Sequence, residues 1–93
     1  MKHERYLFAT TDHEVIYKSD KEMHGHLGLH DQLPKGKEFP VVPPKGKIYI
    51  NKKLTRKRRK QIAKHERYEN YLMKKYGFSY QKAHRMAQKW ERH

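Results

Sequence analysis

Two histidines and three acids in the C-terminal half of the chain have the residue types and spacing of a metal site. His65 and Glu69 stand four positions apart, so on a helix both side chains can reach one ion. Glu66, between them, occupies the position where a metal hydrolase carries its general base. His84 would be a third ligand, and Glu91 would be a fourth ligand or a hydrogen-bond partner behind the ligands. Zinc is the candidate ion for this set of donors.

The composition around these residues makes the acids conspicuous. The last 47 residues contain 16 Lys and Arg but only three acids, which are Glu66, Glu69 and Glu91. A carboxylate that faces a core is costly unless a cation or a metal compensates it. A buried network of His and Glu that orients the helices would meet this requirement without a metal. The sequence favours this structural network, and the metal site is the alternative.

Two helices are expected to position these side chains. Thr55 suits the N-cap of a long helix that runs to about Tyr76, and Gly77 suits the left-handed position after its last turn. Ser79 then caps a second helix over residues 80–92. Because the connection is very short, the two helices should form an antiparallel hairpin.

Helical phasing at about 100° per residue places the candidate ligands between the two helices. His65, Glu66 and Glu69 fall on the apolar side of the first helix, and His84 and Glu91 fall on that of the second. Residues at equal distances from the turn come together in such a hairpin. Glu69 is therefore expected beside the turn of the second helix that begins with His84.

The N-terminal half is expected to supply a small β element. Residues 6–10 and 14–18 are short β-prone runs that suggest a hairpin, and residues 47–51 form a further strand pattern. Residues 19–46, which contain all four prolines, indicate a long irregular connection.

The predicted fold class is α+β, with a small N-terminal β-hairpin or sheet and a C-terminal antiparallel helical hairpin. Ninety-three residues suit one small domain. In that domain, residues 1–51 are the β-rich and loop portion, and residues 55–92 are the basic helical hairpin.

The composition excludes several classes of protein. There is no cysteine, which excludes a disulfide framework and zinc fingers of the cysteine type. The apolar runs are only a few residues long, so no membrane association is expected. The N-terminus lacks the apolar stretch of a signal peptide, and the expected compartment is the cytoplasm.

The net charge of +13 lies entirely in residues 47–93, because residues 1–46 carry seven basic and seven acidic residues. Such asymmetry predicts a polyanionic partner, which could be DNA, RNA, a nucleoprotein complex or an acidic protein surface. A solvated helix face is the alternative. The candidate nucleic-acid-binding residues are Lys52, Lys53, Arg56, Lys57, Arg58, Arg59, Lys60, Lys64 and Arg67.

The strand pattern at residues 48–50, followed by His65-Glu66-Arg67-Tyr68-Glu69, resembles the strand and active helix of small zincin-like metallopeptidases. The resemblance implies a helix that carries an HExxH motif, in which the two histidines bind zinc and the glutamate activates water. This chain departs from that motif, because Glu69 stands where the second histidine would be. A carboxylate can also bind zinc.

A longer string, HExxE followed by Tyr80-x-x-Ala83-His84-x-x-Ala87 and Glu91, is similar to small uncharacterised proteins of phages and prophages. This resemblance covers roughly residues 46–92. It implies a shared fold and the cytoplasm of a host cell as the compartment, but no activity.

A second histidine group lies in the long connection. His24, His26 and His30 form an HxHxxxH pattern that could chelate a metal. Loop polarity is the simpler explanation of these residues.

Two functions of different classes follow from the sequence. The first is a small, basic, phage-type accessory protein that binds nucleic acid or a nucleoprotein complex through the Lys/Arg-rich face of its helices. The second is a miniature metal-dependent hydrolase with ligands His65, Glu69 and His84, and with Glu66 as base. The sequence favours the first, because positive charge is plentiful and the catalytic motif is incomplete.

Overall fold

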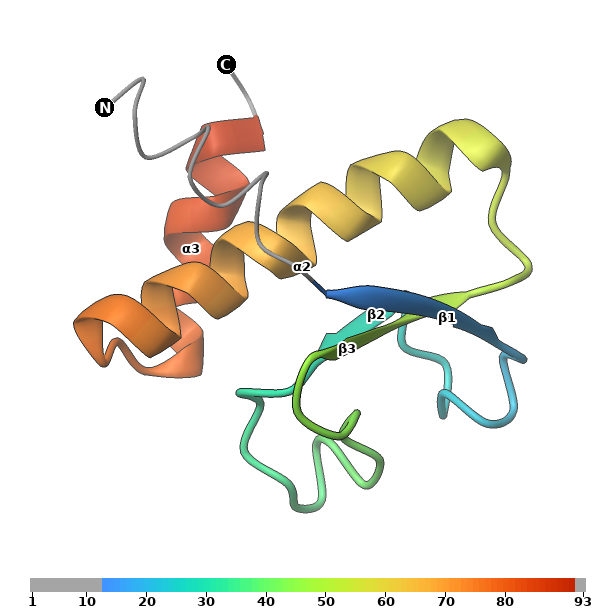
Figure 1. Cartoon of the computed structure of the whole chain (residues 1–93), viewed down its shortest axis with the longest axis horizontal. Coiled ribbons are helices and arrows are strands. Elements are labelled where there is room, and N and C mark those ends of the chain that lie inside the picture. Colours follow the sequence, from blue (N-terminus) through green and yellow to red (C-terminus); the bar gives the residue numbers. More distant parts are fainter. Residues whose placement is uncertain (1–12, 92–93) are drawn as a thin grey trace.

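In the computed structural model, which describes residues 13–91, a long helix lies over a three-stranded sheet and a second helix packs against the first (Figure 1). Strands β1 (Glu14–Lys18), β2 (Gly28–His30) and β3 (Lys47–Asn51) are arranged in the order β1-β3-β2. The central strand β3 runs parallel to β1 and antiparallel to β2. β2 is therefore an edge strand within the described part of the chain.

Period-two alternation decides which side chains of the sheet face the helices. His30 pairs with Ile48 and Gly28 pairs with Ile50, so these four residues share the face toward α2. Ile48 and Ile50 are completely buried on that face. Leu29 points the other way, because it alternates with its neighbours along the strand.

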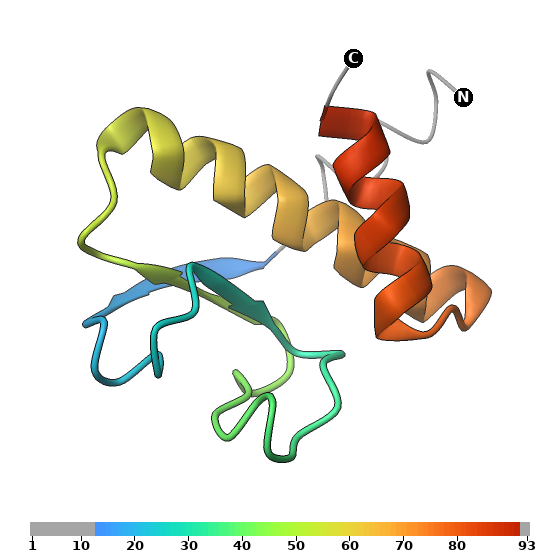
Figure 2. The same cartoon turned by 180° about the vertical axis from the view of Figure 1, so that it is seen from behind.

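The connecting loops cover the face of the sheet away from the helices (Figure 2). Leu29 packs there in a buried cluster with Met23, Leu33 and Phe39, and Tyr49 of β3 contacts the cluster. These apolar side chains anchor the segment between β2 and β3, which has little regular structure of its own. Tyr80 of the second helix also packs against this cluster, so the loops reach the helical layer.

Helix α2 (Arg56–Tyr76) begins and ends where its capping residues require. The Thr55 hydroxyl accepts a hydrogen bond from the Arg58 N–H at 3.2 Å. Gly77 has a φ of 68°, and its N–H donates to the Met73 carbonyl at 3.0 Å. A side chain is disfavoured at that φ, so glycine suits the end of this helix.

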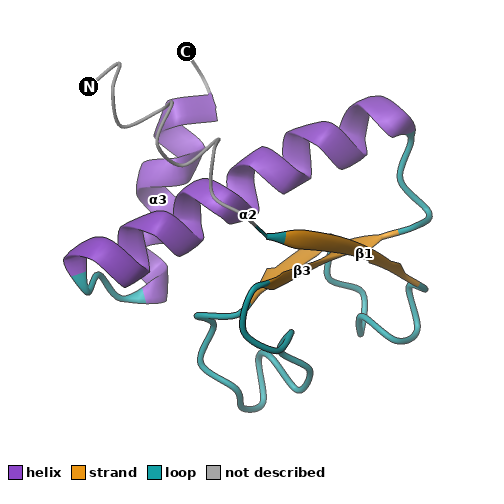
Figure 3. Ribbon diagram, in the orientation of Figure 1, coloured by secondary structure: helices purple, strands orange, loops and turns teal. Residues whose placement is uncertain are grey.

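Helix α3 (Tyr80–Glu91) follows after three residues and completes a helical hairpin (Figure 3). Its first turn is capped by the Ser79 hydroxyl, which accepts a hydrogen bond from the Lys82 N–H at 3.3 Å. A buried cluster of Tyr68, Leu72, Ala83 and Ala87 holds α2 against α3. The small alanines let the two helices approach closely.

The structure confirms the α+β class, the strands at 14–18 and 47–51, and both helices with their caps. The prediction of an irregular segment over residues 19–46 was wrong at β2, because three residues are too few to show a strand pattern. The strand predicted at residues 6–10 lies outside the described residues. The described neighbour of β1 is β3, far along the chain. Between residues 13 and 91, no helix has the length and apolar character needed to span a membrane.

Candidate metal centre

The carboxylate of Glu69 is the hub of a buried polar site between β2, α2 and α3. Its Oε1 contacts Nε2 of His30 at 2.9 Å, and its Oε2 contacts Nε2 of His65 at 2.9 Å and Nδ1 of His84 at 2.8 Å. Glu69 itself is only 1% exposed. Burial alone would raise the pKa of Glu69, but the hydrogen bonds from the three histidines lower that pKa to about 2. The side chain is therefore a carboxylate at neutral pH.

Two ring nitrogens converge on one oxygen of this hub. Nε2 of His65 and Nδ1 of His84 both face Oε2 of Glu69 and lie 3.3 Å from each other. The two imidazole rings meet edge to face, with centroids 5.0 Å apart. The two ring nitrogens and the carboxylate oxygen therefore surround one small space.

This donor set fits a zinc-like ion. Ligand atoms at about 2.0–2.1 Å from a tetrahedral ion lie roughly 3.3 Å from one another. The ring nitrogens of His65 and His84 are 3.3 Å apart. Oε2 of Glu69 lies 2.9 and 2.8 Å from them, so an ion would need this oxygen to move back by about 0.5 Å. Two neutral imidazoles and one carboxylate are also a common ligand set of catalytic zinc.

A second group of donor atoms, from His30, Glu66 and Glu69, also lies within 4.8 Å. The hydrogen bonds of His30 argue against a role for it as a ligand. Its Nδ1 accepts from the backbone N–H of Gln32 at 3.2 Å, so the proton of the neutral ring is on Nε2. A ring that bound a metal through Nε2 would instead carry a proton on Nδ1, pointing at that N–H. His30 therefore donates to Glu69 and orients it.

Asn70 and Asp31 hold His30 in this state. The Asn70 amide Nδ2 contacts Nδ1 of His30 at 3.2 Å and donates to Oδ1 of Asp31 at 2.6 Å. The other oxygen of Asp31 accepts the Gly46 N–H at 2.6 Å. Burial tends to raise the pKa of Asp31, but the bonds from Gly46 and Asn70 lower it below its ordinary value. The ionised Asp31 needs a donor, which fixes the orientation of the amide.

Glu66 lies beside the hub and faces the same pocket as the candidate ligands. A carboxylate oxygen of Glu66 is within 4.8 Å of the donor atoms of His30 and Glu69. Gly28 of β2 packs directly against its side chain, since a Cβ at Gly28 would lie 2.7 Å from Cγ of Glu66 and 2.6 Å from a methyl carbon of Ile62. Only glycine leaves Glu66 in this position.

A pocket of about 710 Å³ opens onto the site. One wall comes from α2, a second from β2 and the loops that precede and follow it, and a third from α3. The lining residues are His26, Leu27, Gly28, Leu33, Phe39, Arg58, Gln61, Ile62, Lys64, His65, Glu66, Glu69, Tyr80, His84 and Gln88. The pocket can hold a small molecule or a polypeptide segment, and His84 is the candidate ligand most exposed to it.

Tyr80 contributes a phenol to this pocket. Its ring packs on Phe39 with centroids 4.9 Å apart and on His84 with centroids 5.3 Å apart. Burial, together with the charges of Glu69 and Glu66, raises the pKa of Tyr80 to about 12. The phenol therefore keeps its proton at neutral pH and can donate a hydrogen bond.

The structure brings together three of the four predicted ligands, His65, Glu69 and His84. The prediction that Glu69 lies beside His84 is confirmed. The side chain of Glu91 lies outside the described residues. Spacing along the chain does not connect His30 with Glu69, because their contact joins residues 39 positions apart.

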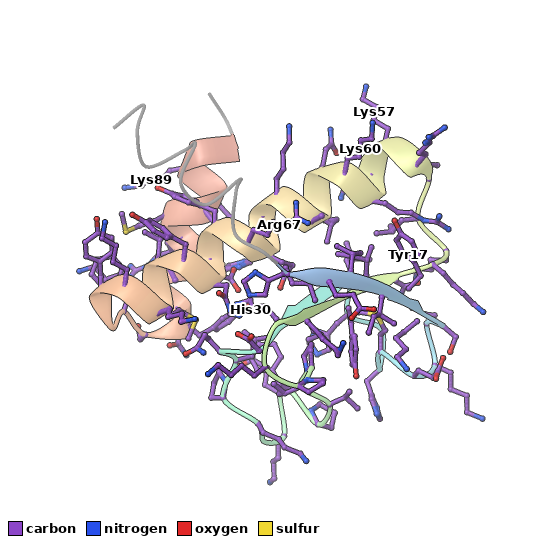
Figure 4. The ribbon with its side chains drawn as sticks, in the orientation of Figure 1. Tyr17, His30, Lys57, Lys60, Arg67 and Lys89 are labelled. Carbon is purple, nitrogen blue, oxygen red and sulfur yellow. The ribbon has the colours of Figure 1, made fainter. Side chains whose placement is uncertain are left out.

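The HxHxxxH pattern does not form one site. His30 faces α2 (Figure 4), whereas His24 is exposed with a φ of 52°. Nε2 of His26 contacts the Glu38 carbonyl oxygen at 2.8 Å. The interpretation of these three histidines as a chelating group is wrong, because only one of them reaches the buried layer.

The predicted nucleic-acid-binding residues are distributed around the N-terminal half of α2. Arg56, Lys57 and Lys60 are exposed, and Figure 4 shows Lys57 and Lys60 pointing away from the sheet. Arg58 and Lys64 line the pocket instead.

Four of these residues lie elsewhere on the surface. Arg59 donates to the Lys52 carbonyl at 2.6 Å and lies over the ring of Tyr17. Lys53 pairs with Asp20 at 3.1 Å. Lys52 is exposed, and Arg67 is partly buried. The nine residues therefore belong to several surfaces and not to one face.

Comparisons of the chain with protein-family models, with curated proteins and with solved structures found no match.

Proposed function

We propose that this protein is a metal-dependent hydrolase that cleaves peptide bonds, with His65, Glu69 and His84 as metal ligands and Glu66 as general base. One observation carries the proposal. Two histidine nitrogens from different helices converge on one oxygen of a buried carboxylate, at the wall of an open pocket. A structural network of His and Glu would account for the contacts, but it does not require an open pocket beside them.

An ion held by these ligands would supply Lewis acidity, polarising a substrate carbonyl and making a water molecule easier to deprotonate. Glu66 takes the proton from water as the water oxygen attacks the carbonyl carbon. Glu66 then delivers that proton to the leaving nitrogen as the C–N bond breaks. The phenol of Tyr80 is available to donate a hydrogen bond to the carbonyl oxygen as negative charge develops there.

The edge strand supports a polypeptide substrate. Gly28 of β2 and the preceding Leu27 line the pocket, and within residues 13–91 β2 pairs with a strand on one side only. An extended peptide can add to such an edge through main-chain hydrogen bonds, while its side chains enter the neighbouring pocket. The apolar wall formed by Leu33, Phe39 and Ile62 suits that placement.

Elemental analysis of the purified, untagged protein, together with hydrolysis of a mixed peptide library, tests this function. We expect about one bound zinc or similar ion per chain and slow cleavage of selected peptides. His84→Ala should lose the ion, whereas Glu66→Gln should keep the ion and lose roughly 100-fold or more in kcat. Absence of stoichiometric metal, with no thermal shift on adding zinc, manganese or iron, would contradict the proposal.

A second candidate function rests on a separate observation. The exposed side chains of Arg56, Lys57 and Lys60 surround the start of α2, whose first turn contains no acid. Positive charge opposes the helix dipole at that end, so helix stability does not account for it. Contact with the phosphates of nucleic acid or of a nucleoprotein complex would account for this positive charge.

Electrophoretic mobility with generic DNA and RNA tests the binding function. A salt-dependent shift is expected, and it should weaken when Arg56, Lys57 and Lys60 are changed together to Gln. Neutralising Lys35, Lys37 and Lys45, which are exposed on the loop between β2 and β3, provides a control with the same loss of charge. An unchanged mobility at low salt would argue against binding.

A further inference from the structure

The pocket continues along α2 from the candidate metal centre to the first turn of the helix. Arg58 and His65 are seven positions apart, and Glu69 follows four positions later, so the three side chains fall on nearly the same stripe of the helix. Gln61 and Ile62 lie between Arg58 and His65 and also line the pocket. The axial distance from Arg58 to His65 is about 10 Å at the usual helical rise.

The two ends of this pocket differ in charge. Among the residues that line it, the carboxylates are Glu66 and Glu69, and both lie at the candidate metal centre. Away from that centre, Arg58 is the formally charged lining residue, and Lys64, next to His65 along the chain, adds a second cation near the centre. A divalent ion would offset the two carboxylates, so the remaining charge would be positive.

The Arg58 side chain is oriented by a hydrogen bond to a neighbouring side chain of α2. Its Nη1 donates to Oε1 of Gln61 at 2.8 Å, across one turn of α2. The other guanidinium donors can take an oxyanion in a forked arrangement. Lys64, one position before the candidate ligand His65, adds a positive charge to the pocket lining near the candidate metal centre.

We infer that the substrate of the proposed hydrolase is a peptide with an acidic side chain about three residues from the cleaved bond, recognised by Arg58. This inference rests on the proposed function and names its substrate class. The spacing follows from geometry, because an extended chain rises about 3.3 Å per residue and therefore covers the 10 Å distance in about three residues. A nucleic acid fits this pocket less well, since its other lining residues include Leu27, Leu33 and Phe39.

Binding of fluorescent peptides to the zinc-loaded, full-length Glu66→Gln variant tests the inference without turnover. The peptides carry Glu, Gln or Lys at one position at a time. At low salt, we expect Glu at one position to bind roughly threefold to fivefold more tightly than Gln, since exposed ion pairs contribute modestly. The preference should shrink in high salt.

Arg58→Glu should abolish or reverse the preference for Glu over Gln. An acid at this position suits the N-terminus of α2, so the variant is expected to fold and to retain its zinc. Lys89→Glu is a matched control, because Lys89 is exposed on α3 and does not line the pocket. That variant should keep the preference of the parent.

Two results of this binding experiment would overturn the inference. One is an equal affinity for Glu and Gln peptides at every position, or a preference that survives Arg58→Glu. The other is an Arg58-dependent affinity for a single-stranded oligonucleotide in place of the peptides. Hydrolysis of the Gln peptides by the wild-type protein is measured alongside and tests the proposed function separately. Absence of hydrolysis of every peptide overturns both.

Discussion

His30 of β2 donates a hydrogen bond from Nε2 to Oε1 of Glu69 of α2 across 2.9 Å, between two side chains that are almost fully buried. The bond occupies one oxygen of the carboxylate and leaves the other directed at His65 and His84. His30 is itself fixed by the N–H of Gln32. The sheet therefore sets the orientation of a carboxylate whose other described hydrogen-bond partners, His65 and His84, lie on the helices.

Removing this donor is expected to weaken metal binding. His30→Ala should lower zinc affinity by roughly tenfold to 100-fold, because Glu69 loses the partner that orients it. His30→Gln, which retains a donor, should restore part of the affinity. Competition with a chromogenic chelator measures both variants, and His24→Asn, at an exposed histidine, is the control. Equal zinc affinities in wild type and His30→Ala would show that the bond serves stability alone.

A methyl group at Gly28 is expected to impair hydrolysis. The new Cβ would lie 2.7 Å from Cγ of Glu66 and 2.6 Å from Ile62, so the general base must move. Peptide hydrolysis should fall at least tenfold, with zinc content retained. Gly36→Ala is the matched control, because nothing lies within 4 Å of a Cβ at that position. Comparable activity in the two variants would mean that the site tolerates the shift.

The phenol of Tyr80 is expected to act in the transition state. Tyr80→Phe removes one hydroxyl from the pocket and leaves the ring contacts with Phe39 and His84 in place. We expect kcat to fall by roughly tenfold to 100-fold, with a small change in KM, because the bond strengthens as charge develops on the carbonyl oxygen. A change confined to KM would instead assign Tyr80 to substrate binding. Tyr76→Phe, at an exposed ring, is the control.

The metal-free protein is expected to lose stability in acid through Glu69. Its pKa falls from 4.5 in the unfolded chain to about 2 in the folded state, so the carboxylate stabilises the fold fully above pH 4.5. That contribution, on the order of 3 kcal/mol, disappears as the pH falls toward 2.

Urea unfolding in the presence of a chelator measures this effect. The free energy of unfolding of the wild type should exceed that of Glu69→Gln at pH 6, and the difference should shrink by pH 3. Glu38→Gln, at an exposed acid, should change little at either pH. A difference between wild type and Glu69→Gln that is constant from pH 6 to pH 3 would contradict the lowered pKa of Glu69 in the folded state.

Local rules were sufficient for the helical part of the candidate site. Thr55, Gly77 and Ser79 set the limits of α2 and α3, because capping depends on neighbouring residues. The spacing of His65 and Glu69 then placed both side chains on one face. The short connection at Gly77 brought His84 to the same carboxylate.

Only the tertiary structure added His30, Gly28 and the pocket. β2 is three residues long, and its pairing with β3 depends on a loop of 16 residues whose path local propensity does not specify. The same packing separated the basic residues, directing Arg58 into the pocket and Arg59 onto Tyr17. The sequence by itself determined which residues share a helical face, because backbone periodicity is local. The tertiary structure decided which strand lies beneath that face, because strand pairing joins residues far apart in the chain.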